Sequence, residues 1–424
     1  MNKCLNNLPR ELSMIIRQVS KISAENRMPA YLVGGCLRDL ILKTKNLDLD
    51  IAVEADGIFF AQKLAQKLKA SIKIHNRFKT ATLILTSGLK VDIATTRKEI
   101  YPYSAALPVV SSGSLYEDLK RRDFTINALA LSLAKVKDKE IIDPYGGCAD
   151  LALGYVRILH NLSFEDDPTR IFRAVRFSQR FNFKIEPKTF ALLKQASALR
   201  LLDKVSDQRK REELILALKE KNPFSLIKQL GDLGALTFIS PQLKISRSTK
   251  ILFNSLDREI AWFVRNFPEH RMLKIWLVYF MGLLAPLTLS EVTRIVRRLS
   301  LTKIDQQQVA SCYKLRKKTI AALSRKQITP NQIFLLLEPL GYEIIIFLRA
   351  ISQNNNLLKH SQSFIKKYNG MRLCVNGCDL RSLGVVPGPE YRKIFTKVLA
   401  AKLNGQVKSR QTELALIRKL VKNK

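Results

Sequence analysis

Acidic residues and long apolar runs are scarce in this chain. Its 424 residues include 36 aspartates and glutamates against 72 lysines and arginines. The longest apolar run, residues 275–289, is interrupted by Pro286 and falls short of the ~20 residues that a membrane-spanning helix needs. The mixed, charged stretch at residues 1–20 lacks the apolar core of a secretory signal. We therefore expect a cytoplasmic protein with no membrane partner, and a buried helix in the apolar run.

Cysteine is also sparse, with six residues scattered along the chain. Only Cys374 and Cys378 are close together, and no second pair of cysteines or histidines completes the ligand set of a structural zinc site. Free thiols are the ordinary state of cysteines in the cytosol, and that is the state we expect for these.

The shortage of acidic residues leaves a formal net charge of +36, carried by lysines and arginines all along the chain. Such a field favours a polyanionic partner. Aromatic residues that would stack single-stranded bases are not obviously interleaved with the basic ones. RNA with double-helical character, bound through its phosphates, therefore fits better. The alternative is a solvated basic surface without a partner.

The apolar patterning divides the chain into an α/β part and an all-α part. Residues 30–145 mix helical stretches with short strand-like runs such as "ATLILT" and "VDIAT". Beyond residue 150 the strand signals fade, and amphipathic helical stretches follow one another, for example at 206–220 and 309–325. The length allows about two to four domains. No fixed-period repeat is visible.

Two carboxylates stand one residue apart in a predicted strand. Leu47 to Val53 read as a strand, so Asp48 and Asp50 point to one face and Leu49 to the other. The two like charges repel, and nothing in the local sequence neutralises them. A hard divalent cation such as Mg²⁺, which prefers carboxylate and phosphate oxygens, would do so. The alternative is a solvated strand face.

A pair of glycines precedes these aspartates. "LVGG", residues 32–35, is an apolar run that ends in Gly34 and Gly35, whose backbone a ligand can approach closely. The following "CLRDLILK" suits a helix start, where backbone amides bind phosphate, and Arg38 adds a charged fork. A plain strand-to-helix turn with an Arg38–Asp39 ion pair is the alternative. Together with the aspartates, the turn predicts a site for a nucleoside triphosphate with Mg²⁺.

The segment "EDDPTRIFRAVRFSQRF" predicts a helix with one strongly basic face. Asp167 before Pro168 is an ordinary start, with the aspartate as N-cap and the proline in the first turn. Four arginines share one face at spacings of three, three and four, namely Arg170, Arg173, Arg176 and Arg180. Charged faces are often merely solvated. Four arginines with no interleaved acid repel one another, however, which favours an anionic ligand.

The first two polar positions of this helix suit base recognition. Asp167 and Arg170 are one turn apart and can point together. Aspartate only accepts hydrogen bonds and arginine only donates them. Cytosine and adenine each present an amino donor beside a ring-nitrogen acceptor, whereas guanine and uracil present a carbonyl and an N–H. The pair therefore accepts C and A and leaves unsatisfied groups against G and U.

These motifs belong to an ordered series. "LVGGCLRD" and "DLD" are followed by "VDIATTRKEIYPYSAALPVV" (91–110), "LYEDLKRRDFTINALAL" (115–131), "DPYGGCADL" (143–151), "FEDDPTRIFRAVRFSQRFNF" (164–183) and "NGCDLRSLGVVPGPEYRKIFTKVLAAKLNGQV" (376–407). The series resembles the class II tRNA nucleotidyltransferase and bacterial poly(A) polymerase family, densely over 30–240 and thinly over 245–370. One departure is visible. Many members have Glu-Asp where this chain has Asp166-Asp167.

The resemblance implies an architecture of a catalytic α/β head and helical neck, body and tail. We assign residues 1–150 to the head, 151–240 to a neck that carries the nucleotide-selecting helix, and 241–424 to a body and tail that bind tRNA. The family is understood to use Asp167 and Arg170 as a protein template for the incoming base.

The resemblance also implies roles for residues outside the first motifs. Asp92, in the strand-like "LKVDIAT", would join the catalytic aspartates, although it could instead bond to a neighbouring amide or basic residue. One arginine of Arg121 and Arg122 would contact triphosphate, and which of them does so stays open. Asp123 and Asn127 would hold the ribose or the loop. From its position alone, Asp123 is also a good N-cap for a helix that follows. Arg173 and Arg176 would orient the base or the phosphates.

The implied reaction is addition of CCA to the 3′ end of tRNA from CTP and ATP, with release of pyrophosphate. Mg²⁺ held by Asp48 and Asp50 would activate the attacking hydroxyl and stabilise the leaving oxygens. A CC-adding enzyme, an A-adding enzyme and a poly(A) polymerase share the head motifs and differ in loops such as residues 97–114. A non-catalytic RNA-binding protein is a further alternative, against which the intact motifs argue. The oligomeric state is not predicted.

Overall fold

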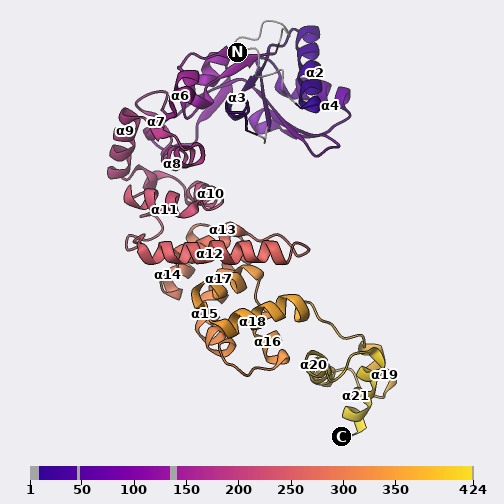
Figure 1. Cartoon of the computed structure of the whole chain (residues 1–424). Helices are drawn as coiled ribbons and strands as arrows, with labels where there is room; N and C mark the ends of the chain where they lie inside the picture. Colours follow the sequence, from indigo (N-terminus) through magenta and orange to yellow (C-terminus); the bar gives the residue numbers. More distant parts are fainter. Residues whose placement is uncertain (1–8, 45–47, 134–140, 423–424) are drawn as a thin grey trace. The chain divides into compact units, whose positions relative to one another are not determined.

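The computed structural model of the chain describes residues 9–44, 48–133 and 141–422 (Figure 1). The chain divides into two compact units, Met1–Phe238 and Ile239–Lys424. The division into head, neck, body and tail at residues 150 and 240 stays a prediction. Each of the two units has a hydrophobic interior of its own.

The first unit is built on a seven-stranded sheet in the order β3-β4-β5-β2-β1-β8-β9. Its strands are β1 (Ala30–Val33), β2 (Leu49–Val53), β3 (Ser71–His75), β4 (Thr80–Ile84), β5 (Lys90–Thr95), β8 (Ala130–Ser132) and β9 (Ile141–Ile142). Strands β2 and β5 run parallel, and the other neighbours are antiparallel. A separate antiparallel ribbon joins β6 (Arg97–Ile100) to β7 (Val109–Ser112).

Short helices connect and cover these strands. They are α2 (Arg10–Asn26), α3 (Gly34–Ile41), α4 (Gly57–Leu68), α5 (Leu115–Lys120) and α6 (Gly147–Leu153), and α2 lies beside α4 (Figure 1). Helix α4 begins where the Asp56 carboxylate accepts the N–H groups of Ile58 and Phe59, which satisfies two amides of the first turn.

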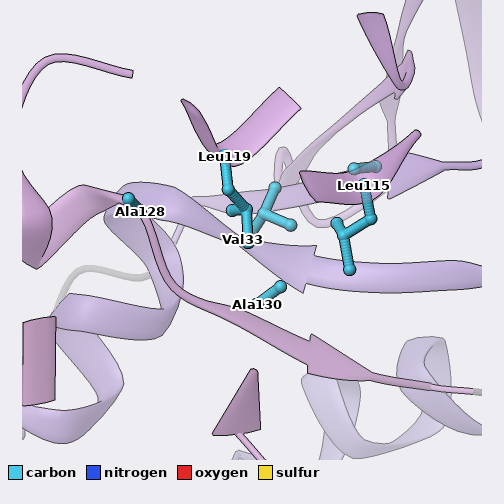
Figure 2. Packing of buried hydrophobic residues seen from close by; sticks show 6 residues of the cluster. Val33, Leu115, Leu119, Ala128 and Ala130 are labelled. Atoms are coloured by element: carbon cyan, nitrogen blue, oxygen red, sulfur yellow. The ribbon is translucent and has the colours of Figure 1, made fainter. Parts of the chain in front are cut away.

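A small hydrophobic cluster lies where β1 ends. Figure 2 shows Leu115 and Leu119 of α5 packed with Val33, Ala128 and Ala130, all of them buried. Val33 pairs with Ala130 across the sheet. Because Val33 comes directly before the glycine pair and Ala128 directly after Asn127, this packing fixes both segments against each other.

The remainder of the first unit is mostly helical. Its helices are α7 (Ser163–Asp166), α8 (Arg170–Phe181), α9 (Pro187–Ala198), α10 (Asp207–Leu218) and α11 (Pro223–Asp232), and a short parallel pair joins β10 (Tyr155–Val156) to β11 (Lys184–Ile185). Helix α8 packs against α10 and α11. It buries its apolar stripe, which includes Ile171, Phe172 and Val175, and so its arginines are left for the opposite face.

In the described residues of the second unit, the regular elements are all helices. They are α12 (Arg247–Asn266), α13 (Ile275–Leu283), α14 (Leu289–Arg298), α15 (Lys303–Leu323), α16 (Pro330–Leu337), α17 (Tyr342–Ser352), α18 (Asn355–Ser363), the π-helix η4 (Phe364–Tyr368), α19 (Gly377–Ser382), α20 (Pro389–Leu403) and α21 (Arg410–Lys422). The apolar run forms the buried helix α13, as expected. None of the described helices has the length and apolar character of a membrane span. The predicted fold class, α/β followed by all-α, is confirmed.

Candidate active site

Parallel pairing brings two of the predicted catalytic aspartates side by side. Asp50 of β2 stands in register with Asp92 of β5, and Asp48 lies just before β2 and is exposed. Burial raises the pKa of Asp50 to about 6, and the charges of Asp92 and Asp48 add to this rise, while Arg122 and Arg38 oppose it. Negative charge is therefore concentrated at this edge of β2 and β5.

The donor chemistry of these carboxylates fits a hard divalent cation. Within the described ranges, no three histidine, cysteine or acidic side chains form a ready-made metal cluster. Asp50 and Asp92 nevertheless offer carboxylate oxygens from adjacent strands, and Mg²⁺ commonly completes its shell with water and substrate phosphates. The Thr82 hydroxyl also donates to Asp92, a partner that is neither the backbone amide nor the basic residue considered as the alternative.

The glycine turn lies between these aspartates and a group of arginines. Gly34 has a φ of +64°, and a Cβ there would lie 2.4 Å from Nη1 of Arg122. The positive φ favours glycine at this position, and a side chain there would push the end of Arg122 aside. A Cβ on Gly35 would lie 3.4 Å from Nη2 of Arg38 and 4.0 Å from Oδ2 of Asp50. As predicted, the turn opens a helix, and α3 begins at Gly34.

Arg38 makes both a local and a long-range contact. Its Nε donates to Oδ1 of Asp39 over 2.8 Å, which is the ion pair considered as the alternative, and its Nη1 donates to Oδ1 of Asn127. The Asn127 amide in turn donates to Asp123 over 2.9 Å, and Arg173 donates to Asp123 over 2.7 Å. One chain of hydrogen bonds thus runs from the glycine turn to α8.

The prediction that Asp123 caps a helix is wrong. The segment that follows is a single 3₁₀ turn, η2 (Thr125–Asn127), which begins after Phe124 and has no side-chain cap. The Asp123 carboxylate accepts from the Phe124 N–H and is otherwise taken up by Asn127 and Arg173. These partners outweigh burial and lower the pKa of Asp123, so it is ionised at neutral pH.

Both arginines of the "RRD" stretch reach the site. Arg121 and Arg122 pair with opposite oxygens of the buried Asp118 over 2.8 and 2.9 Å, and Arg121 also pairs with Glu99 over 3.1 Å. Burial would raise the pKa of Asp118, but the two guanidinium groups lower it. The geometry therefore does not single out one arginine, because Asp118 holds both.

Helix α8 begins later than the sequence predicted. Its first residue is Arg170, with Thr169 as N-cap, rather than Pro168. The N–H of Arg170 bonds to the carbonyl of Asp167, and that of Ile171 to the carbonyl of Pro168, so the chain enters the helix through a tighter turn. Asp167 still accepts the backbone N–H and the hydroxyl of Thr169.

The arginine face has no interleaved acid of its own, as the sequence shows, but acidic side chains of other segments reach it. Glu213 of α10 lies 3.8 Å from Arg173 and 3.1 Å from Arg176, and Glu220 contacts Arg180. In the described part of the chain, Nε of Arg176 and Nε of Arg122 still have no hydrogen-bond partner. Nearby acids thus neutralise part of the basic face, and these two buried Nε donors are left without a hydrogen bond.

Asp167 and Arg170 are brought to one cavity without pairing to each other. Asp167 pairs with Arg209 of α10 over 2.8 Å. Arg170 donates to the carbonyl of Arg121 over 3.0 Å and to that of Ser163 over 3.4 Å. Sequence reasoning missed Arg209, since nothing local marks a residue of another helix as a partner of Asp167.

These side chains surround a cavity of about 460 Å³, a size typical of ligand sites. It is lined by Gly35, Arg38, Glu99, Tyr101, Arg121, Arg122, Asp123, Asn127, Asp167, Arg170, Arg173, Arg176, Phe177 and Arg180. Of the predicted residues, Gly34, Asp48, Asp50 and Asp92 are not among the lining residues. Glu99, Tyr101 and Phe177 line the cavity and were not predicted, although all three lie in segments that carried the resemblance.

Two family models match the first part of the chain. Residues 30–157 match the poly A polymerase head domain, and residues 182–246 match the probable RNA and SrmB-binding site of polymerase A. The cavity residues from Gly35 to Asn127 fall in the first match. Those from Arg170 to Phe177 lie in α8, between the two matches, and Asp167 lies just before α8.

Curated relatives match over nearly the whole chain. The A-adding tRNA nucleotidyltransferase of Geobacter sulfurreducens is 36% identical over 415 residues, which cover 97% of this chain and 47% of that protein. The A-adding tRNA nucleotidyltransferase of Halalkalibacterium halodurans is 31% identical over 428 residues, which cover 100% of this chain and 95% of that protein. The chain thus spans about half of the first relative and nearly all of the second.

Two solved structures also match over nearly the whole chain. A CCA-adding enzyme in its apo form II has a TM-score of 0.77 at 32% identity, with 100% of this chain and 98% of that chain covered. The Thermotoga maritima CCA-adding enzyme complexed with tRNA has a TM-score of 0.71 at 31% identity, with 99% and 98% covered.

Proposed function

Because the chain belongs to the family of tRNA nucleotidyltransferases and bacterial poly(A) polymerases, we propose that it transfers nucleotides from a nucleoside triphosphate to the 3′ hydroxyl of tRNA. The observation that carries this proposal is the convergence, in one cavity, of the glycine turn, the arginines that follow α5 and the basic face of α8. The adjacent aspartates of β2 and β5 supply the carboxylates for the chemistry.

In the proposed reaction the 3′ hydroxyl attacks the α-phosphorus, and the bond to pyrophosphate breaks. Asp48 and Asp50, with Asp92 beside Asp50, would hold a divalent metal, for which we propose Mg²⁺. When bound, the metal lowers the pKa of the hydroxyl and offsets charge on the phosphate oxygens. Gly34 and Gly35 bring backbone close to the phosphates.

The arginines of the cavity have two tasks in this proposal. Arg38, Arg121 and Arg122 hold the triphosphate, because their guanidinium groups offer paired donors to phosphate oxygens. Asp123 and Asn127 tie Arg38 to Arg173 and so keep the phosphate and base ends of the site in register.

Base selection is assigned to the start of α8. Asp167 accepts and Arg170 donates, which fits the Watson–Crick edges of cytosine and adenine, while Arg173 and Arg176 orient the base or the phosphates. The ion pair from Arg209 leaves the second oxygen of Asp167 for the ligand. The large positive charge supports tRNA as the macromolecular partner.

The comparisons support two alternative products of the reaction. Addition of the terminal A from ATP is supported by the A-adding relatives at 36% and 31% identity. Addition of the complete CCA from CTP and ATP is supported by the CCA-adding enzymes among the solved structures. We favour addition of the terminal A, because the Geobacter sulfurreducens relative, at 36% identity, is named an A-adding enzyme.

The deciding experiment uses three tRNA substrates that lack CCA, CA or only the final A. Purified protein and Mg²⁺ receive CTP alone, ATP alone or both, and the products are resolved to single nucleotides. Extension of only the third substrate, by one A, supports the favoured activity. Full extension of the first substrate establishes CCA addition instead. Long A tails indicate a poly(A) polymerase, and no extension of any substrate overturns the proposal.

A further inference from the structure

Arg38 is packed against two aromatic rings of α8, the helix that carries Arg170. Its guanidinium carbon lies 4.6 Å from the ring centre of Phe181 and 5.3 Å from that of Phe177. Both phenylalanines belong to α8, and their rings are stacked at 5.9 Å with 17° between their planes. Arg38 of α3 therefore lies against a pair of aromatic rings that belong to α8.

The hydrogen bonds of Arg38 leave part of its edge available. Arginine has five N–H donors. In the described chain, Nε and Nη2 approach Oδ1 of Asp39, each over 2.8 Å, and Nη1 donates to Asn127. One donor on Nη1 and one on Nη2 remain. Arg38 lines the cavity, and we take these two donors to be the ones that face a ligand there.

We propose that Phe181 is a positioning residue for the triphosphate, acting through Arg38. Its ring fixes the plane of the guanidinium, so that the two remaining donors meet phosphate oxygens in a paired geometry. Helix α8, which carries Arg170 and begins three residues after Asp167, then also sets the hold on the phosphates. The inference rests on the proposed function only in taking a nucleoside triphosphate as the ligand.

Phe181 is a better test of this role than Phe177. The Phe177 ring lies 5.4 Å from Arg173 and 5.6 Å from Arg176 as well as near Arg38, and Phe177 lines the cavity itself. Among the described residues, Arg38 is the cation that lies over the Phe181 ring. Replacing Phe181 therefore changes one cation–ring contact rather than three.

The experiment measures equilibrium binding to the full chain in the presence of Mg²⁺. ATP affinity is determined by calorimetry, and inorganic tripolyphosphate affinity by displacement of ATP. Phe181→Leu keeps an apolar side chain but removes the ring, and should weaken both ligands by about three- to tenfold. Phe181→Tyr keeps the ring and should bind as the parent chain does. Equal weakening of both ligands locates the defect at the phosphates rather than at the base.

Two further variants separate positioning from general damage. Phe190→Leu removes a ring of α9 that lies 4.9 Å from Nζ of Lys194, away from the cavity, and should leave both affinities unchanged. In an Arg38→Met background, Phe181→Leu should cost nothing further, because its effect passes through Arg38. Thermal unfolding of each variant reports its folding, and Phe181→Met replaces Phe181→Leu if the leucine variant does not fold.

The inference is overturned if Phe181→Leu binds ATP as tightly as the parent chain. It is also overturned if the tyrosine variant loses as much affinity as the leucine variant, or if the losses add in the Arg38→Met background. Failure of the proposed function looks different, because the parent chain would then bind ATP and tripolyphosphate without extending any tRNA. A parent chain that binds neither ligand would overturn both.

Discussion

Asp50 is held next to a second carboxylate by the register of two parallel strands. Strands β2 and β5 put Asp50 opposite Asp92, and burial together with this neighbour raises the pKa of Asp50 to about 6. A carboxyl whose pKa is higher in the folded chain than in the unfolded chain destabilises the fold when it is ionised. At neutral pH the ionised Asp50 therefore lowers the free energy of unfolding. Residues selected for function often have this effect.

Asp50→Asn should separate function from stability. We expect nucleotide transfer to tRNA to fall roughly a thousandfold, since a ligand for the metal is lost. We expect the melting temperature to stay level or rise, because a repelled charge is removed. Single-turnover transfer and thermal unfolding measure the two effects. Asp203→Asn, at an exposed aspartate paired with Arg200, is the control. Transfer within tenfold of the parent rate would contradict the assignment.

Gly34→Ala tests the close approach of Arg122. The added Cβ would meet Nη1 at 2.4 Å, and φ is +64°. Gly88 also has a positive φ, +85°, but open space around it. Both alanine variants should lose about 1 kcal/mol of stability. Only Gly34→Ala should also weaken ATP binding, by about tenfold, because Arg122 must move. Chemical denaturation and calorimetry compare the two variants, and equal ATP affinities would show that Arg122 does not depend on this glycine.

Helix α8 shows how far sequence could predict an element and where it could not. The spacing of Arg170, Arg173 and Arg176 was enough to predict the helix and its basic face, because both depend on local periodicity. The acidic partners Glu213 and Asp123 could not be predicted, since they lie in other elements and only the packing of α8 against them creates the pairs. The late helix start likewise depends on a turn that local rules do not distinguish from a capped start.

The start of α8 also permits a test of base selection. Asp167→Ala should reduce the preference for ATP over GTP by about a hundredfold or more, because the acceptor that GTP leaves unsatisfied is gone. Asp166→Ala, at the neighbouring acid 3.6 Å from His160, should leave the preference unchanged. Rates of incorporation of each nucleotide into tRNA give the ratio. The reverse pattern would mean that the template register is shifted by one residue.

Over the whole molecule, both units contain buried carboxylates held by arginine, as Asp118 is held by Arg121 and Arg122 in the first unit. In the second unit, Glu343 is fully buried and accepts two bonds of 2.7 Å from Arg271 and one of 2.9 Å from the N–H of Lys274. Burial would raise the pKa of Glu343, but these bonds lower it below its ordinary value of 4.5. This stabilisation is present above that value and is lost as the pH falls through the lower folded pKa.

Glu343→Gln should therefore destabilise the second unit in a pH-dependent way. We expect a loss of about 1 to 3 kcal/mol at pH 7, and a smaller difference from the parent chain in acid below the folded pKa. The chain has two tryptophans, Trp262 and Trp276, and both lie in this unit, so their fluorescence during urea unfolding reports on it. Glu269→Gln, at an exposed glutamate, is the control. A difference that stays constant with pH would contradict the role of the charge.

The boundary between the units has a consequence for how the chain can evolve. Every residue that lines the cavity lies between Gly35 and Arg180, well before the boundary at Phe238 and Ile239. Mutations and insertions after that boundary can accumulate without touching a residue of the cavity. Evolution can therefore exchange or remodel the helices that follow while the lining of the cavity is inherited intact.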